Sequence, residues 1–220
     1  MNFIYNRYGF TTFSLLVLIT ALLALTIQIL FVSEAIYYQS FGTQLDIVRI
    51  NKIVDSANKY KWLSYAVLPV LILIRVFYTS IFLFIGIFFT ELKAEFGKLF
   101  KIALLADFVY VLAGLVKLVI LIFFREVNTL QDLQFQPLSV MELLNAKSID
   151  PLFVYPLSLL NVFELGYFLV LAWLLVGVIN EANEERTLRF GQSLKLVTTS
   201  YGSGLLLWVL VIMFITLNLS

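Results

Sequence analysis

Residues 65–124 read YAVLPVLILIRVFYTSIFLFIGIFFTELKAEFGKLFKIALLADFVYVLAGLVKLVILIFF, and this stretch decides the fold of the chain. It contains two long apolar runs, Ala66–Phe89 and Lys101–Phe124, joined by the short charged connector Thr90–Lys98. Each run exceeds the roughly 18 apolar residues that a helix needs to cross a bilayer. The stretch therefore predicts two consecutive membrane spans.

The composition of the whole chain agrees with a membrane protein. Its residues are 61% hydrophobic and 13% charged, whereas a soluble domain has about 25% charged residues. The net charge of +1, without any basic block, argues against nucleic acid as a partner. The chain has no Cys and no His, which removes thiolate nucleophiles, imidazole bases and the usual ligands of zinc and haem. We therefore expect a protein that is not an enzyme and has no cofactor and no metal site.

Three further apolar runs complete the set of spans. They cover about 13–32, 157–180 and 194–217, in addition to 66–89 and 101–124. The run at 13–32 follows Arg7 and could be a secretory signal, but it is about 20 residues long against the 7–15 of a signal peptide core. We therefore read it as a retained span. The predicted fold is a single all-α domain, residues 1–220, that forms a polytopic transmembrane bundle of five helices.

Two long connections lie between the spans, at about 33–61 and 125–156. The first has apolar residues at helical spacing, with charged residues on the other side. That pattern is typical of an interfacial helix lying in the headgroup plane, and equally of a solvated helix packed on the bundle. Both connections would lie on the same side of the membrane.

The distribution of Lys and Arg predicts the orientation, because cytoplasmic loops are enriched in these residues. One side of a five-span chain would hold Arg7, Lys93, Lys98, Lys101, Arg186, Arg189 and Lys195, and the other Arg49, Lys52, Lys59, Lys61, Arg125 and Lys147. The first group is concentrated in short segments next to the spans. We therefore expect a cytoplasmic N-terminus and an outside C-terminus, in a bacterial inner membrane.

Four polar residues on different spans fall at similar depth, about 23 Å from the cytoplasmic boundary at 1.5 Å per residue. They are Gln28, Arg75, Lys117 and Glu164. Intramembrane charges usually have functional partners, so these residues predict an inward-facing cluster with excess positive charge that suits an anionic ligand. Two alternatives remain. The cations could snorkel to the headgroups, or an ion pair could fix the helix register. Asp107, about two turns into its span, is expected to meet water or Lys101.

The last span contains a run of small residues. Ser200, Gly202, Ser203 and Gly204 predict a face on which another helix packs closely. The alternative is an unwound segment whose carbonyls coordinate an ion. Ser56 and Lys59 have the serine–lysine spacing of some acyl enzymes but lack the companion motifs.

The last two spans resemble those of the Yip family of membrane proteins. The resemblance lies in residues 161–168 (NVFELGYF), Trp173–Val178 and residues 190–195 (FGQSLK), and it extends over roughly Phe96–Leu217. The Asp-Leu-Tyr-Gly-Pro motif and the long N-terminal region of the eukaryotic branch are missing. The resemblance implies a compact, non-enzymatic bundle of five helices.

These observations lead to two functional hypotheses. The first is a non-enzymatic scaffold or accessory subunit of a membrane complex, with lipids and other membrane proteins or a second copy as partners. The second is a small transporter or lipid-handling protein that uses the Arg75, Lys117 and Glu164 site for an anionic ligand. An acyl or phosphoryl transferase would depend on carboxylates alone, and these are too scattered in the sequence for a paired site.

Overall fold

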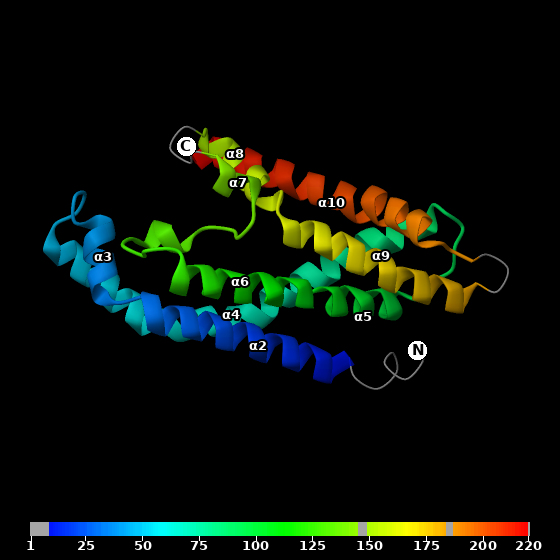
Figure 1. Cartoon of the computed structure of the whole chain (residues 1–220), viewed down its shortest axis with the longest axis horizontal. Coiled ribbons are helices and arrows are strands. Elements are labelled where there is room, and N and C mark those ends of the chain that lie inside the picture. The colour runs from blue at the N-terminus through cyan, green and yellow to red at the C-terminus, as the bar shows by residue number, and fades with distance from the viewer. Residues whose placement is uncertain (1–8, 145–148, 184–186, 220) are drawn as a thin grey trace.

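The computed structural model describes residues 9–144, 149–183 and 187–219. The structure is 82% helical, and no strand occurs within these ranges. The helices run side by side along the long axis of the molecule (Figure 1). Among the described residues, five helical stretches are long and apolar enough to cross a membrane. The all-α bundle with five spans is therefore confirmed, and the chain is a multi-pass membrane protein.

The spans are longer or shorter than predicted at several ends. Their observed bounds are α2 (Gly9–Phe31), α4 (Ile47–Phe88), α5 with α6 (Phe96–Ala106 and Phe108–Phe123), α9 (Val162–Ala182) and α10 (Phe190–Leu219). Asp107 joins α5 to α6 with a helical backbone conformation (φ −60°, ψ −20°), so these two helices form one span.

The two ends of the bundle differ in their connections. We call the end with residues 89–95 and the segment leading from α9 to α10 the short-loop end. The opposite end, with the long connections, is the long-loop end. It contains α3 (Glu34–Phe41), the short 3₁₀ helix η1 (Leu130–Leu133), α7 (Val140–Leu143) and α8 (Pro151–Leu159).

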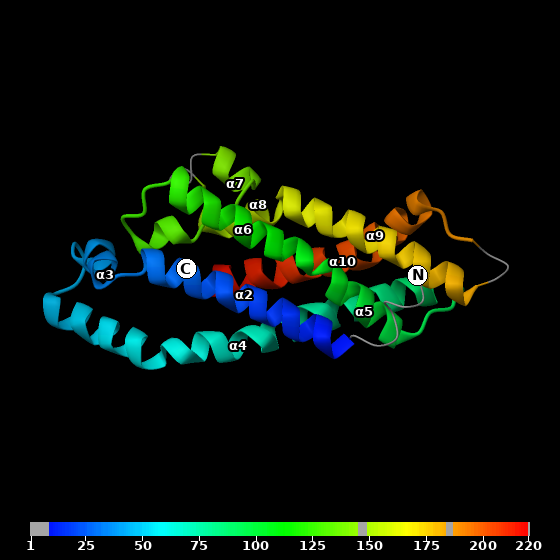
Figure 2. The ribbon, with the colours of Figure 1, turned by 60° about the horizontal axis from the view of Figure 1, so that its bottom comes forward.

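Helix α4 extends far beyond the predicted second span. Its 42 residues correspond to about 63 Å, twice the roughly 30 Å hydrocarbon core. Asp46 caps it by accepting a hydrogen bond from the Arg49 backbone N–H (3.1 Å). The structure thus differs from the expectation of a separate helix in residues 33–61, because most of the polar segment continues directly into the span. Figure 2 shows α4 changing direction along its length, and the internal Pro69 explains the bend.

The first part of α4 packs against α3 at the long-loop end. Ile36 of α3 and Ile50 and Val54 of α4 are buried, and the Tyr38 hydroxyl donates to the Asn51 side chain. These contacts join two helices of the same connection, and they are equally compatible with a helix in the headgroup plane and with a solvated helix.

The fourth span begins five residues later than the predicted position 157. Asp150 and Pro151 start α8, which ends at Leu159, and α9 starts only at Val162 after a break in the helix. Asn161 caps α9 by accepting from the Glu164 backbone N–H at 2.8 Å. The break therefore places Glu164 in the first turn of α9, where the helix dipole stabilises a negative charge.

Two apolar clusters hold the bundle together. The larger one joins α4, α5, α9 and α10 through buried residues that include Leu83, Ile102, Leu175 and Val197. The smaller one joins α2 to α4, α5 and α6 around Leu16, which is the one residue of α2 that is buried. Helix α2 is the least buried of the five spans, and it lies between α4 and α6 in Figure 2.

The connection after α6 is ordered by an acidic cap. Asp132 accepts from the Thr129 hydroxyl and backbone N–H, each at 2.8 Å, and from the Asn128 N–H at 3.1 Å. Partial burial alone would raise the pKa of Asp132, but these bonds and the charge of Arg125 together lower that pKa below its ordinary value.

This cap predicts a local acid transition. A carboxylate whose pKa is lower in the folded protein stabilises it above the unfolded pKa of about 3.9, and that stabilisation is lost as pH falls through the folded pKa. We expect hydrogen exchange of the 128–132 backbone, corrected for intrinsic rates, to accelerate below about pH 4. Asp132→Asn should exchange faster already at neutral pH. Equal protection at pH 3 and pH 7 would contradict this role.

Candidate functional site

An ion pair joins α4 to the α5–α6 span inside the bundle. The Arg75 Nη2 atom donates to Asp107 Oδ2 at 2.5 Å, and the Asp107 side chain is fully buried. The Arg75 side chain is 40% exposed, and its guanidinium lies 4.2 Å from the centre of the Tyr110 ring. The Arg75 side chain therefore points toward the α5–α6 span, where it contacts the carboxylate of Asp107 and the ring face of Tyr110.

A second carboxylate, that of Glu164, contacts the hydroxyl of Tyr110. Glu164 accepts hydrogen bonds from the hydroxyls of Tyr110 (2.7 Å) and Tyr201 (2.9 Å), and it is 7% exposed. Three spans, those of α6, α9 and α10, thus meet at one carboxyl group. No Lys or Arg pairs directly with Glu164 among the described residues.

Tyr167 fills the space between these groups. Its ring lies 5.1 Å from that of Tyr110 and 5.3 Å from that of Tyr201, and its hydroxyl donates to Thr79 Oγ1 at 3.1 Å. We refer to the whole set as the polar cluster: Arg75, Thr79, Asp107, Tyr110, Glu164, Tyr167 and Tyr201. With both carboxyl groups ionised its formal charge is −1, from one Arg and two acids.

The structure brings together two of the four residues predicted to meet. Arg75 and Glu164 both contact Tyr110. Gln28 lies elsewhere, where it accepts from the Tyr65 hydroxyl. Lys117 lies 5.3 Å from the Phe135 ring, next to Arg125 on the same ring, which places it at the long-loop end.

The expectation for Asp107 was wrong. Asp107 was expected to meet water or Lys101, whereas its ionic partner is Arg75 of α4. The sequence did contain a signal for the cluster, because Asp107 with Tyr110 and Glu164 with Tyr167 are spaced by three, and Arg75 and Thr79 by four. Residues at these spacings share a helix face.

The ion pair leaves some hydrogen-bonding capacity free. Arg75 Nε and Asp107 Oδ1 are buried and make no hydrogen bond to the described residues. Arg75 and Asp107 are thus joined by one hydrogen bond rather than by the two of a bidentate pair. Within the described residues, no three acidic side chains come close enough to hold a metal ion.

The predicted small-residue face meets two helices. A Cβ atom at Gly204 would lie 2.6 Å from Phe82 of α4, and one at Gly202 would lie 3.5 Å from Phe168 of α9. Ser200 is buried against Gly86 of α4, while Ser203 is exposed. Helix α10 is continuous through this stretch, so the alternative of an unwound ion-binding segment is wrong.

The hydroxyls on Glu164 should contribute measurably to stability. We expect Tyr201→Phe to lower the free energy of unfolding by about 1 kcal/mol, the usual size of a hydrogen bond between membrane helices. Denaturant titration in mixed micelles measures this change. Phe168→Leu, next to Tyr201 but without a polar partner, controls for altered packing against its ring. A stability of Tyr201→Phe equal to wild type would contradict a structural role for the bond.

Comparison with known proteins identified no relative: no protein-family model, no curated protein and no solved structure matches the chain. The resemblance to the Yip family therefore stays a prediction.

Proposed function

We propose that this protein is a non-enzymatic scaffold or accessory subunit that acts through helix and lipid contacts in a bacterial inner membrane. The observation that carries this proposal is the internal pairing of the polar cluster. Arg75 is engaged by Asp107, and Glu164 by two tyrosines, all from other helices. Charges used in this way hold the bundle together, which leaves its outer surface as the place for interaction.

The outer surface of α2 supports the same proposal. Apolar side chains along this helix are exposed: Phe10, Leu15, Leu18, Leu22, Leu25, Ile29 and Leu30. Because α2 is the least buried of the five spans, a helix of another protein or of a second copy can pack along it. Lipid covers it otherwise.

The proposal includes an orientation and a family. The short-loop end would face the cytoplasm, since its basic residues lie close to the spans. Membership of the Yip family, with its non-enzymatic five-helix bundle, would fit this assignment.

The hypothesis of an anionic ligand in the polar cluster loses its main support. That hypothesis required two positive charges, Arg75 and Lys117, beside the single negative charge of Glu164. Lys117 lies outside the cluster and Asp107 pairs with Arg75, so no cation of the cluster is left over to attract an anion.

Photo-crosslinking in native membranes tests the proposal. A photoreactive residue replacing Leu22 of α2 should give a discrete adduct with a membrane protein or a second copy, which persists through mild detergent extraction. The matched position is Leu206 of α10, which is also exposed (67%, against 54% for Leu22) and should not give that adduct. A lone monomer from both positions would contradict the proposal.

A further inference from the structure

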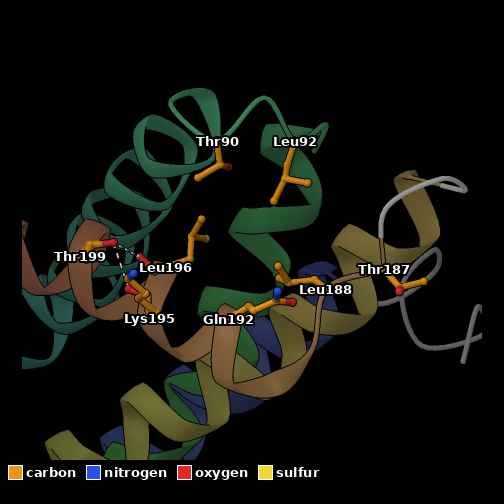
Figure 3. Close-up of a pocket in the computed structure, with 8 residues that line it drawn as sticks. All are labelled: Thr90, Leu92, Thr187, Leu188, Gln192, Lys195, Leu196 and Thr199. Carbon is orange, nitrogen blue, oxygen red and sulfur yellow. Dashed lines mark hydrogen bonds between the residues drawn. The ribbon is translucent and has the colours of Figure 1, made fainter.

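A cavity of about 460 Å³ opens at the short-loop end, outside the polar cluster. Figure 3 shows Thr90 and Leu92, both from the loop after α4, facing Lys195, Leu196 and Thr199 of α10. The remaining lining residues, Thr187, Leu188 and Gln192, come from the segment entering α10 and from its first turn.

Two asparagines one turn apart at the C-terminal end of α9 bind the two connections beside this cavity. Asn183 accepts from the Lys93 N–H (3.1 Å) and donates to the Lys93 carbonyl (3.0 Å). Asn180 makes the same two-way contact with Leu188, accepting at 2.5 Å and donating at 3.1 Å. Each side-chain amide thus binds the backbone of one connection and holds it against the end of α9. The cavity between them opens to the surface, since Thr90, Thr187, Gln192, Lys195 and Thr199 are exposed.

The lining combines two kinds of chemistry. Lys195 supplies a cation, while three threonines and Gln192 supply hydroxyl and amide groups; Leu92, Leu188 and Leu196 form the apolar part. The hydroxyls of Thr90 and Thr199 donate to backbone carbonyls, so the donors that face a ligand are the Lys195 ammonium, the Gln192 amide and the Thr187 hydroxyl. A cation with amide and hydroxyl donors suits a phosphate group. The cavity volume lies within the range of roughly 300–1,000 Å³ found for small-molecule sites.

The position of the cavity indicates where such a phosphate would come from. The cavity lies where α4 ends and α10 begins, so a bilayer crossed by these two helices would have its headgroups at this level. Phe88 and Phe89, directly before Thr90, are 75% and 78% exposed. These rings offer acyl chains a surface beside the cavity, which a soluble phosphate would not use.

We infer that this cavity binds the phosphate-bearing headgroup of an anionic phospholipid, with Lys195 as the charged contact. The inference rests on this cavity alone and holds whether or not the scaffold function proposed above is correct. It makes the short-loop end a specific lipid site within the generally apolar surface of the protein.

Lipid titration of the purified full-length protein tests this inference. The probe is phosphatidylglycerol added to mixed micelles, with bound lipid counted by native mass spectrometry and phosphatidylcholine as the comparison lipid. Wild type should retain one phosphatidylglycerol more tightly than phosphatidylcholine. Lys195→Gln should weaken phosphatidylglycerol binding about fivefold, since one Lys at a lipid surface contributes roughly 1 kcal/mol.

Two further variants separate the cavity from general surface charge. Lys93→Gln removes the same charge at the same end but outside the lining, and it should change binding less than twofold. Thr187→Trp fills the cavity without removing charge, and it should weaken binding at least as much as Lys195→Gln. Size-exclusion chromatography confirms that each variant remains folded.

Three results would overturn the inference. Equal effects of Lys195→Gln and Lys93→Gln would assign the lipid preference to general charge. Unchanged binding in a folded Thr187→Trp variant would place the lipid elsewhere. Displacement of the lipid by inorganic phosphate at an equal concentration would show that the acyl chains contribute nothing to binding, which excludes a lipid site.

Discussion

Asp107→Ala is expected to destabilise the bundle by about 3 kcal/mol, the largest effect of any substitution considered for this protein. The Asp107 side chain is fully buried, and its removal leaves the Arg75 guanidinium without its anion inside the bundle. Losing one member of a buried pair usually costs roughly 3–5 kcal/mol. We expect the lower part of that range because the Arg75 side chain is 40% exposed and can reorient. Denaturant titration in mixed micelles measures the loss.

A double variant distinguishes the broken pair from a simple loss of packing. Arg75→Met combined with Asp107→Leu removes both charges, and it should recover most of the lost stability because no unpaired charge remains. Asp55→Ala, an exposed Asp in the projecting part of α4, should change stability by less than about 0.5 kcal/mol. If the double variant is as unstable as Asp107→Ala, the loss of stability does not come from the unpaired charge of Arg75.

Gly86→Ala is expected to cost about 2 kcal/mol by forcing α4 away from α10. A Cβ atom at Gly86 would overlap the Ser200 Cβ, which is attached directly to the helix backbone and cannot rotate away. A hydrogen bond also joins the two helices about two turns along α4, where the Tyr78 hydroxyl donates to the Gly204 carbonyl at 2.6 Å. We expect the variant to unfold at lower denaturant concentration and this hydrogen bond to lengthen.

Two controls make this expectation specific to the contact. Gly97→Ala, in the first turn of α5, places its Cβ where no atom lies within 4 Å, and it should leave stability unchanged or slightly raised. Ser200→Gly should rescue Gly86→Ala by removing the opposing Cβ. Full stability of Gly86→Ala alone would show that α4 and α10 are not held at this distance.

The spans could be predicted from the sequence because the hydrocarbon core of a bilayer admits only helices with apolar side chains, and hydropathy measures that property directly. Any helix that crosses must be apolar over about 20 residues, whatever it packs against. The observed α2 and α10 therefore contain the predicted runs 13–32 and 194–217 almost entirely. Helix ends depend on local capping instead. Hydropathy could not show that α4 continues back to its cap at Asp46, or that Asn161 starts α9.

Errors at the helix ends explain what was missed in the polar cluster. The third span was taken to start at Lys101, but its helix starts at Phe96, which adds about 7 Å to the depth of Asp107. That difference moves Asp107 from the interface to the level of Arg75. Lys117 and Gln28 were assigned by depth alone, and depth does not say which way a side chain points. Their partners, Phe135 and Tyr65, lie on other segments.

The central claim, that these helices cross a membrane and alternate in direction, is tested most directly by cysteine labelling. The chain has no Cys, so single substitutions need no altered background. We predict that a membrane-impermeant maleimide labels Ser56→Cys and Asn128→Cys in spheroplasts, and that Lys93→Cys and Thr187→Cys react only after lysis. Labelling of Ser56→Cys and Lys93→Cys from the same side would contradict a crossing by α4, and with it the bundle described above.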